Sequence, residues 1–198
     1  MYTSPSSLIL GFHGCDREVA ERILRGEITH LDKSENQYDW LGHGIYFWED
    51  NPDRALQFAQ ELNAMPRPSK PRIRNPFILG AIIDLGHCLN LLETRSLRLV
   101  SEAHDHLSSI SAEAGYPLPE NKRDPGTGEL LRRELDCAVI ETLHDLNESA
   151  PYDSVRGVFQ EGEELYPNAG FRAKNHIQIC VRNTASIKGY FRLLPENE

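Results

Sequence analysis

The sequence lacks the long apolar run, of roughly 20 residues, that a membrane-spanning helix needs. Its N-terminus carries no basic segment, and the apolar stretch at 8–12 (LILGF) is too short for a signal peptide. Neither an internal repeat nor a low-complexity tract is present. These absences favour an ordinary globular protein of the cytoplasm, and we expect no contact with a membrane.

The chain also lacks the CxxC pairs that are typical of zinc sites and redox centres. Its four cysteines lie far apart, each within an apolar or strand-like stretch: Cys15, Cys88, Cys137 and Cys180. An even number could form two disulfides, but buried thiols are the simpler interpretation. We expect no metal site.

An excess of positive charge is absent as well. The 30 acidic residues outnumber the 21 basic ones, which gives a formal net charge of −9. Binding to nucleic acid draws most of its strength from neutralised phosphates, so this charge argues against a general electrostatic grip on nucleic acid. Lys70, Arg72 and Arg74 share one proline-rich loop, where a solvated linker is a simpler interpretation than a basic groove.

Hydrophobic periodicity predicts strands at both ends of the chain and helices between them. The predicted strands are 7–12, 44–48, 77–84, 154–160, 176–182 and 189–193, with 89–92 continuing the third after a kink; the predicted helices are 16–25, 52–63, 93–114 and 129–146. Asp16 and Asn51-Pro52 start the first two helices, and Gly26 ends the first. This order predicts one α+β domain over 1–198, with helices and loops inserted at about 93–150.

His13-Gly14-Cys15 lies where a predicted buried strand leads directly into a helix. Such a strand end presents free backbone N–H groups, and Gly14 lets a ligand approach the main chain closely. A ligand with an amide could therefore pair with both the N–H and the C=O of Gly14. Taken alone, the same residues are better explained as a core histidine beside a turn glycine.

The segment 38–48 (YDWLGHGIYFW) combines two glycines with five aromatic side chains. Gly42 and Gly44 free the backbone, and the aromatic faces suit the stacking of a flat cationic ring such as nicotinamide. An aromatic core cluster is the plainer interpretation, above all for Trp40 and Phe47. Alone, this segment is only suggestive.

Together, the two motifs resemble the ADP-ribosyltransferases that use a His-Tyr-Glu triad, the group of diphtheria toxin and the poly(ADP-ribose) polymerases. In that group the histidine lies in H-G-[ST] at a strand end, with Ile-Leu ten and eleven residues later, and the tyrosine lies in G-x-G-[IV]-Y-F. This chain has His13-Gly14, Ile23-Leu24 at that spacing, and then Gly42-His43-Gly44-Ile45-Tyr46-Phe47. The resemblance covers 8–59 well and the rest of the chain loosely.

The third triad position departs from the family pattern. The family's glutamate opens a late strand, and the best counterpart here is Gln178, in Gln178-Ile179-Cys180-Val181. An acidic loop precedes it, Gln160-Glu161-Gly162-Glu163-Glu164. Glu161 could therefore supply the missing carboxylate, although an acidic run is more often a solvated turn. The sequence leaves open which of Gln178 and Glu161 is the third catalytic residue.

The resemblance implies an ADP-ribosyltransferase fold, in which two small packed antiparallel or mixed sheets flanked by helices form a cleft for NAD⁺. It also implies roles for individual residues. His13 would contact the adenosine ribose, and Gly14 would hold the carboxamide. Tyr46 and Phe58 would enclose the nicotinamide. Gly44 and His43 would lie beside it, and Ser34 would belong to the loop over the donor.

The function implied is transfer of a single ADP-ribose from NAD⁺ to a macromolecule, in the manner of a bacterial toxin or defence effector. An antitoxin or immunity protein would then be a partner, and the acceptor (protein, nucleic acid or small molecule) is not readable from the sequence. An NAD⁺ glycohydrolase and a catalytically degenerate binding module remain open. An RNA 2′-phosphotransferase is disfavoured by the −9 charge and the Tyr46 motif.

Overall fold

The computed structural model describes residues 8–66, 72–124 and 128–194. Its main feature is a seven-stranded sheet with the order β4-β7-β8-β2-β1-β3-β9. The strands are β1 (Leu8–Asp16), β2 (Ile45–Glu49), β3 (Pro76–Asp84), β4 (Cys88–Asn90), β7 (Ser154–Phe159), β8 (His176–Val181) and β9 (Ile187–Phe191). The helices are α1 (Arg17–Leu24), α2 (Pro52–Ala64), α3 (Thr94–Ala114) and α4 (Glu134–Leu146). The predicted mixture of strands and helices is confirmed.

The expectation of two separate sheets is wrong, because β1 and β2 join the strands into one. That junction is short, with only Gly11–Glu49 and Phe12–Trp48 as paired residues. By contrast, β1 pairs with β3 along nine residues, from Leu8–Asp84 to Asp16–Pro76. The sheet therefore consists of a three-strand half (β1, β3, β9) and a four-strand half (β4, β7, β8, β2), and the two halves part soon after they meet.

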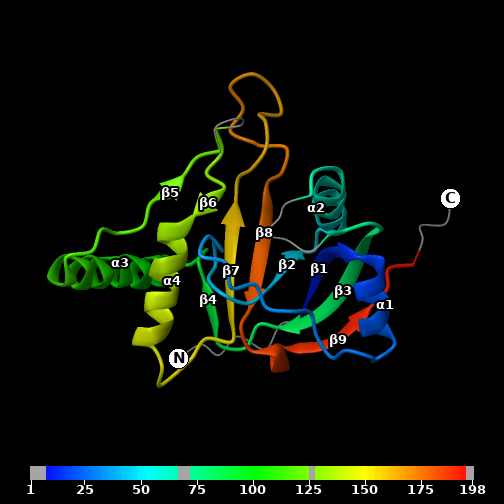
Figure 1. Ribbon diagram of the computed structural model, residues 1–198, viewed down its shortest axis with the longest axis horizontal. Helices are drawn as coiled ribbons and strands as arrows, with labels where there is room; N and C mark the ends of the chain where they lie inside the picture. Colours follow the sequence, from blue (N-terminus) through cyan, green and yellow to red (C-terminus); the bar gives the residue numbers. More distant parts are fainter. Residues whose placement is uncertain (1–7, 67–71, 125–127, 195–198) are drawn as a thin grey trace.

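The helices cover the two faces unequally. Consecutive residues of a strand point to opposite faces, and in β2 Phe47 packs in the cluster that holds Ile23 of α1, whereas Trp48 packs with Ala55 of α2. The apolar side of α4 packs on the same face as Trp48, against Tyr46 and neighbours from β7 and β8. Figure 1 shows α3 and α4 beside the four-strand half and α1 and α2 beside the other.

Helix boundaries follow local capping. Asp16 caps α1 by accepting from the N–H of Glu18, as predicted, and Asn51 caps α2 by accepting from the N–H of Arg54. A third cap shortens α4, which was predicted to begin at 129. Asn121 accepts from the first backbone N–H groups of that helix, at Leu135 and Asp136.

The segment before α4 is extended rather than helical. Residues Arg132–Arg133 form β6 and pair with β5 (Asn121–Lys122) in a small second sheet. The predicted loop at 116–128 therefore contains a strand. Hydrophobic periodicity missed this hairpin because it depends on backbone pairing and on the side chain of Asn121.

The prediction that β4 continues β3 is wrong. β4 lies at the far edge of the sheet, parallel to β7. Gly86 turns the chain with φ +56. Asp153 then holds the new direction, because its side chain accepts from the N–H of His87 and its own N–H donates to the His87 carbonyl. A kink and a reversal look the same in a hydrophobicity pattern.

The structure also bears on the cysteines and on the length of the apolar helices. The four thiols are unbonded, with Cys15, Cys137 and Cys180 buried and Cys88 partly so. Ser7 and Lys70 lie outside the described residues. No helix in the described part of the chain is both long and apolar enough to cross a membrane.

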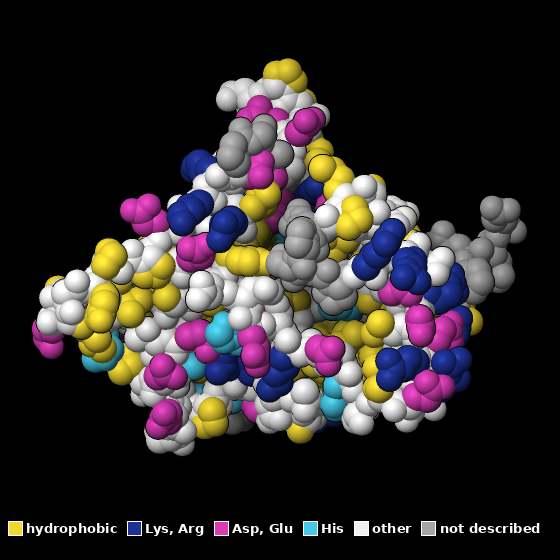
Figure 2. All heavy atoms as spheres, viewed as in Figure 1, with side chains coloured by type: hydrophobic (Ala, Val, Ile, Leu, Met, Phe, Trp, Pro, Cys, Tyr) yellow, Lys and Arg dark blue, Asp and Glu magenta, His cyan; other side chains and the backbone are white. Residues whose placement is uncertain are grey.

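Surface side chains of both charges alternate over most of the face seen in Figure 2, whereas hydrophobic ones gather over α3 and at the tip of the β7–β8 loop. On α3 the exposed residues include Leu97 and Ile110. At the loop tip Leu165, Tyr166 and Phe171 are exposed.

Candidate functional site

A cavity of about 250 Å³ lies at the sheet junction, between α2 and the segment that precedes α4. It is lined by His13, Asp32, Ser34, Tyr38, Asp39, Trp40, Gly44, Tyr46, Trp48, Arg54, Phe58, Glu61, Glu129, Leu131, Glu161, Lys174 and Gln178. Every site residue predicted from the sequence is among them except Gly14 and His43. Segments more than 100 residues apart in the chain thus meet in one cavity.

Tyr46 is held firmly by the turn that precedes it. Its hydroxyl donates to the carbonyl of Gly42 at 2.7 Å and accepts from the N–H of Leu41 at 2.9 Å. Burial raises the pKa of this phenol well above its usual value. Because both bonds occupy the hydroxyl, Tyr46 offers the cavity its ring rather than an acid or a base.

His13 spans the gap at which β1 and β2 part. Its Nδ1–H donates to the carbonyl of Tyr46 at 2.7 Å. In a regular antiparallel pair that carbonyl would bond to Gly14, because the Leu10 carbonyl already accepts from Asp50 N–H and the pattern repeats every two residues. The imidazole of His13 therefore takes the place of the strand partner.

Gly14 lies two residues beyond the last residue pair between β1 and β2. Strand alternation directs its N–H and C=O toward the side where β2 has turned away. Its missing side chain also has a packing role that was not predicted. A Cβ there would lie 2.0 Å from the carbonyl oxygen of Ala55, so the glycine admits the close approach of α2.

Gly44 and Ser34 fix the loop that borders the cavity. The two residues exchange backbone hydrogen bonds, Ser34 N–H to Gly44 at 2.8 Å and Gly44 N–H to Ser34 at 3.0 Å. The Ser34 hydroxyl accepts from the side chain of Asn36 at 2.6 Å. A Cβ on Gly44 would lie 2.5 Å from the sulfur of Cys180, so this glycine permits close contact with β8.

His43 does not line the cavity, contrary to the prediction. Its N–H donates to Glu141 of α4 at 2.7 Å, and its Nε2 lies 3.9 Å from the sulfur of Cys137. The Glu141 carboxylate also accepts from Arg182 at 2.9 Å. His43 therefore anchors the Gly42–Gly44 turn to α4, a contact between distant segments that no local motif reveals.

α2 presents three side chains to the cavity: Arg54, Phe58 and Glu61. Their spacing, i, i+4 and i+7, places them on one face of a helix. The Phe58 ring centroid lies 5.0 Å from that of Trp48, so the two rings form one aromatic wall. Phe58 was predicted here, and the same spacing could have identified Arg54 and Glu61.

Gln178 of β8 lines the cavity. It pairs with Trp48 of β2 on one side and with Gly157 of β7 on the other. Directly paired residues point to the same face, so Gln178 shares the face of Trp48 and, two pairs further along β2, of Tyr46. β8 begins two residues earlier than Gln178, at His176.

Glu161 lies at the end of the cavity where the β7–β8 loop begins. Its carboxylate accepts from Arg54 Nη2 at 3.2 Å, and its side chain is only 12% exposed. Burial raises its pKa, and the Arg54 guanidinium opposes that rise. The predicted acidic residue is thus a cavity wall and not a solvated turn.

His176 lies beside this carboxylate, with Nδ1 3.8 Å from it. Its Nδ1–H donates to the Lys174 carbonyl at 2.6 Å. Burial lowers its pKa to about 4. His176 is therefore neutral near pH 7 and adds no charge to the Arg54–Glu161 pair.

The inserted segment at 93–150 supplies part of the wall, which the sequence did not suggest. The Leu131 carbonyl accepts from Trp40 Nε1 at 3.2 Å. Glu129 accepts from the N–H of Gly162, at the root of the β7–β8 loop. The insertion therefore ties together the two loops that border the cavity.

Within the described residues, no group of three or more His, Cys, Asp or Glu side chains is arranged to hold a metal ion. No family model matches the chain, and no solved structure matches it. One similar protein is the uncharacterized protein MJ0359 of Methanocaldococcus jannaschii, 24% identical over 194 residues, which cover 89% of this chain and 83% of that one. The name of that protein states no function.

Proposed function

We propose that this protein has an ADP-ribosyltransferase fold, binds NAD⁺ in the cavity at the sheet junction and transfers one ADP-ribose to an acceptor. One observation carries the proposal. The two aromatic rings and the histidine that the resemblance predicts for NAD⁺ come from β2, α2 and β1, and all three line the same cavity. Residues that merely fill a core would not need to border an open space together.

The fit to nicotinamide rests on two features. Tyr46 and Phe58 offer ring faces to a flat cationic ring, which such faces attract. The backbone of Gly14 supports the fit as well, because its N–H and C=O are directed toward the parted seam. A carboxamide carries one acceptor and two donor hydrogens, so it can pair with both groups.

The chemistry asked of the site is cleavage of the bond between nicotinamide and ribose C1′, with the bonding electrons leaving on the nicotinamide nitrogen. The acceptor then bonds to C1′ and loses a proton. Positive charge develops on the ribose as the bond breaks, as in glycoside cleavage. Gln178 would accept a hydrogen bond from the ribose, and Glu161 would stabilise the charge and take the acceptor's proton.

Burial suits Glu161 to that task, since a raised pKa makes a carboxylate a better proton acceptor near neutral pH. Gln178 supplies only a dipole, and charge-assisted hydrogen bonds are roughly twice as strong as neutral ones. A glutamine in place of glutamate therefore favours slow transfer of a single ADP-ribose over polymer synthesis.

The test is nicotinamide release from NAD⁺ by the purified protein, alone and with total RNA, DNA or cell protein. We expect release to rise with one fraction. Tyr46→Ala should abolish NAD⁺ binding, whereas Tyr46→Phe, which keeps the ring, should retain most of it. Replacing Gln178 by Glu should raise the rate, since a lost electrostatic contact of this kind costs on the order of 10²–10³.

Each competing function has its own signature in this assay. Free ADP-ribose without a labelled macromolecule identifies a glycohydrolase. Tight NAD⁺ binding without release, even in Gln178→Glu, identifies a binding module. Equal NAD⁺ binding by the wild type and Tyr46→Ala would contradict the stacking of nicotinamide and with it the proposal.

A further inference from the structure

Two buried arginines of this protein differ in how fully their donors are used. Arg156, on β7, forms a two-point pair with Glu49, Nε at 2.5 Å and Nη2 at 2.6 Å. Its remaining Nη1 donates to Asn90 at 3.4 Å. Such a fork-to-fork pair is the arrangement expected of an arginine that serves the fold alone.

Arg54 is more deeply buried but less satisfied. Its side chain is 9% exposed, against 17% for Arg156. Among the described residues its one side-chain hydrogen bond runs from Nη2 to Glu161 at 3.2 Å, while Nε and Nη1 have no hydrogen-bond partner. Nη1 lies 4.0 Å from Glu61. Unsatisfied buried donors are costly and need a reason.

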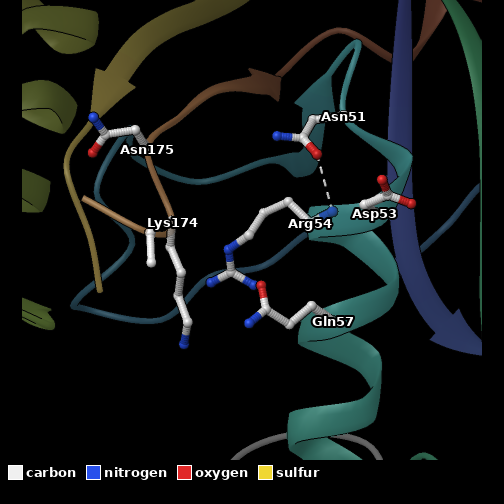
Figure 3. A pocket seen from close by; sticks show the side chains of 7 residues that line it. Asn51, Asp53, Arg54, Gln57, Lys174 and Asn175 are labelled. Carbon is white, nitrogen blue, oxygen red and sulfur yellow. Dashed lines mark hydrogen bonds between the residues drawn. The ribbon is translucent and has the colours of Figure 1, made fainter. Parts of the chain in front are cut away.

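The surroundings of Arg54 point to a ligand. A hollow of about 310 Å³ adjoins the NAD⁺ cavity, and Arg54 and Lys174 border both spaces. In Figure 3 Asp53 points away from the side chains of Arg54 and Lys174. Both cations lie near Glu61, which pairs with Lys174 Nζ at 2.8 Å. Trp48 Nε1 is another buried donor that has no hydrogen-bond partner among the described residues. The guanidinium carbon of Arg54 lies 5.5 Å from the centroid of the Trp48 ring.

We propose that Arg54, with Lys174 beside it, binds a substrate oxyanion, phosphate or carboxylate, that replaces Glu161 on the guanidinium. The guanidinium fork matches either oxyanion in a two-point geometry, which its single bond to Glu161 does not provide. The exchange swaps one anion for another on the guanidinium, so the buried charge of Arg54 keeps a counter-charge. Two sources share this chemistry: the diphosphate of NAD⁺ and an anionic group on the acceptor.

The exchange has a consequence for the proposed reaction, and this part rests on the proposed function. Glu161 released from Arg54 would lose its cationic partner in the same cavity as Gln178. An anionic substrate would then free the carboxylate that stabilises the ribose. The site would thus couple recognition of an anion to the readiness of Glu161.

The first experiment measures anion binding without NAD⁺, by calorimetry with inorganic pyrophosphate, phosphate and acetate. Arg54→Gln should weaken binding about tenfold or more, because hydrogen bonds to charged groups are strong. Glu161→Gln should tighten it, since the competing carboxylate is gone. Arg192→Gln is the matched control: Arg192 pairs with Glu21 at 2.7 Å on the surface, so it removes the same charge elsewhere.

Circular dichroism and thermal unfolding of each variant separate loss of binding from loss of fold, and Arg54→Lys keeps the charge while removing the fork. The proposal is overturned if none of the three anions binds the wild type. It is also overturned if Arg192→Gln weakens binding as much as Arg54→Gln. Neither outcome requires NAD⁺, so failure here is distinguishable from failure of the proposed function.

A second arm identifies the source of the anion. If it is the NAD⁺ diphosphate, Arg54→Lys should weaken NAD⁺ binding but leave binding of nicotinamide alone unchanged. If it belongs to the acceptor, Arg54→Lys should leave NAD⁺ binding intact and slow transfer by raising the KM for the acceptor. Unchanged values in all these measurements would remove Arg54 from substrate recognition.

Discussion

Strands within the four-strand half of the sheet are paired along more residues than the two strands that join the halves. Within the four-strand half, β7 and β8 pair along six residues, and β2 and β8 pair along four. At the junction between the halves only two residue pairs form before the strands part. The cavity lies at this interrupted seam, because continuous backbone pairing elsewhere leaves no space between strands.

The difference shows how a sheet can hold a ligand site without a separate domain. Where strands part, their backbone groups need other partners. The His13 ring satisfies the Tyr46 carbonyl from β1. The insertion closes the open side with Leu131 and Glu129. Side chains and loops thus hold the halves together where the backbone pairing between β1 and β2 ends.

The contact most sensitive to substitution should be that between α2 and the end of β1. In Gly14→Ala the added carbon would lie 2.0 Å from the Ala55 carbonyl oxygen. We expect a loss of about 3 kcal/mol in the free energy of unfolding, since backbone atoms cannot move aside easily. Urea unfolding measures this loss. Gly189→Ala, with no atom within 4 Å of the added carbon, is the control and should cost almost nothing.

Acid should loosen the four-strand half before the other. Burial lowers the pKa of His176 to about 4, below the value of about 6.5 in an unfolded chain. The unfolded chain therefore binds the proton first, so stability is complete above about pH 6.5 and falls as the pH drops toward 4. At about pH 5 the loss from this residue is about 2 kcal/mol.

His144 of α4 packs on the same half, and its pKa is lowered by burial to about 3. Hydrogen exchange at about pH 5 should accelerate at β7 and β8 amides more than at β1 and β3 amides. The variant His176→Gln should reduce the slope of stability against pH. Equal acceleration in both halves would contradict the assignment of acid sensitivity to these histidines.

Tyr46→Phe tests whether the tyrosine hydroxyl holds the turn beside the seam. The ring stays, but the Leu41 N–H loses its partner and the Gly42 carbonyl keeps only the Cys180 thiol, at 3.5 Å. Leaving a buried N–H unpaired and a carbonyl weakly paired costs about 1–2 kcal/mol, which thermal unfolding would detect. Tyr116→Phe, at an exposed site, should leave stability unchanged. If Tyr46→Phe is as stable as the wild type, its hydroxyl does not hold the turn.

The smallest effect is expected where α4 supports that turn. Glu141→Gln keeps an acceptor for the His43 N–H but removes the charge that pairs with Arg182. We expect a loss of about 1 kcal/mol in urea unfolding. Glu102→Gln, on the exposed side of α3, removes the same charge as a control. An equal loss in both variants would show a general charge effect rather than support of the turn.

Local signals predicted most of the elements that form the site. The caps at Asp16 and Asn51 and the apolar face of α2 placed two helices within a residue or two of their observed ends. The His13 and Tyr46 motifs led to side chains that share a cavity. These predictions succeeded because they depend on neighbours in the chain, within one helical turn or one strand.

Apart from the β5–β6 hairpin, the failures involve contacts between distant segments. His43 was predicted at the site but bonds to α4, about 100 residues later. The contact of Gly14 with α2 was not predicted at all, although an added Cβ there would meet the Ala55 carbonyl. β4 was placed after β3 but pairs with β7. No local pattern encodes which distant backbone a residue will meet.

Short-range geometry and chemistry therefore made three features predictable from the chain alone: the alternation of helices and strands, the ends of the first two helices, and the residue types suited to a flat cationic ring. Three others became visible only in the folded molecule. The strands form one sheet with an interrupted seam, an insertion completes the cavity, and Arg54 is buried beside Glu161. Those features depend on packing and on hydrogen bonds between segments that meet only once the chain has folded.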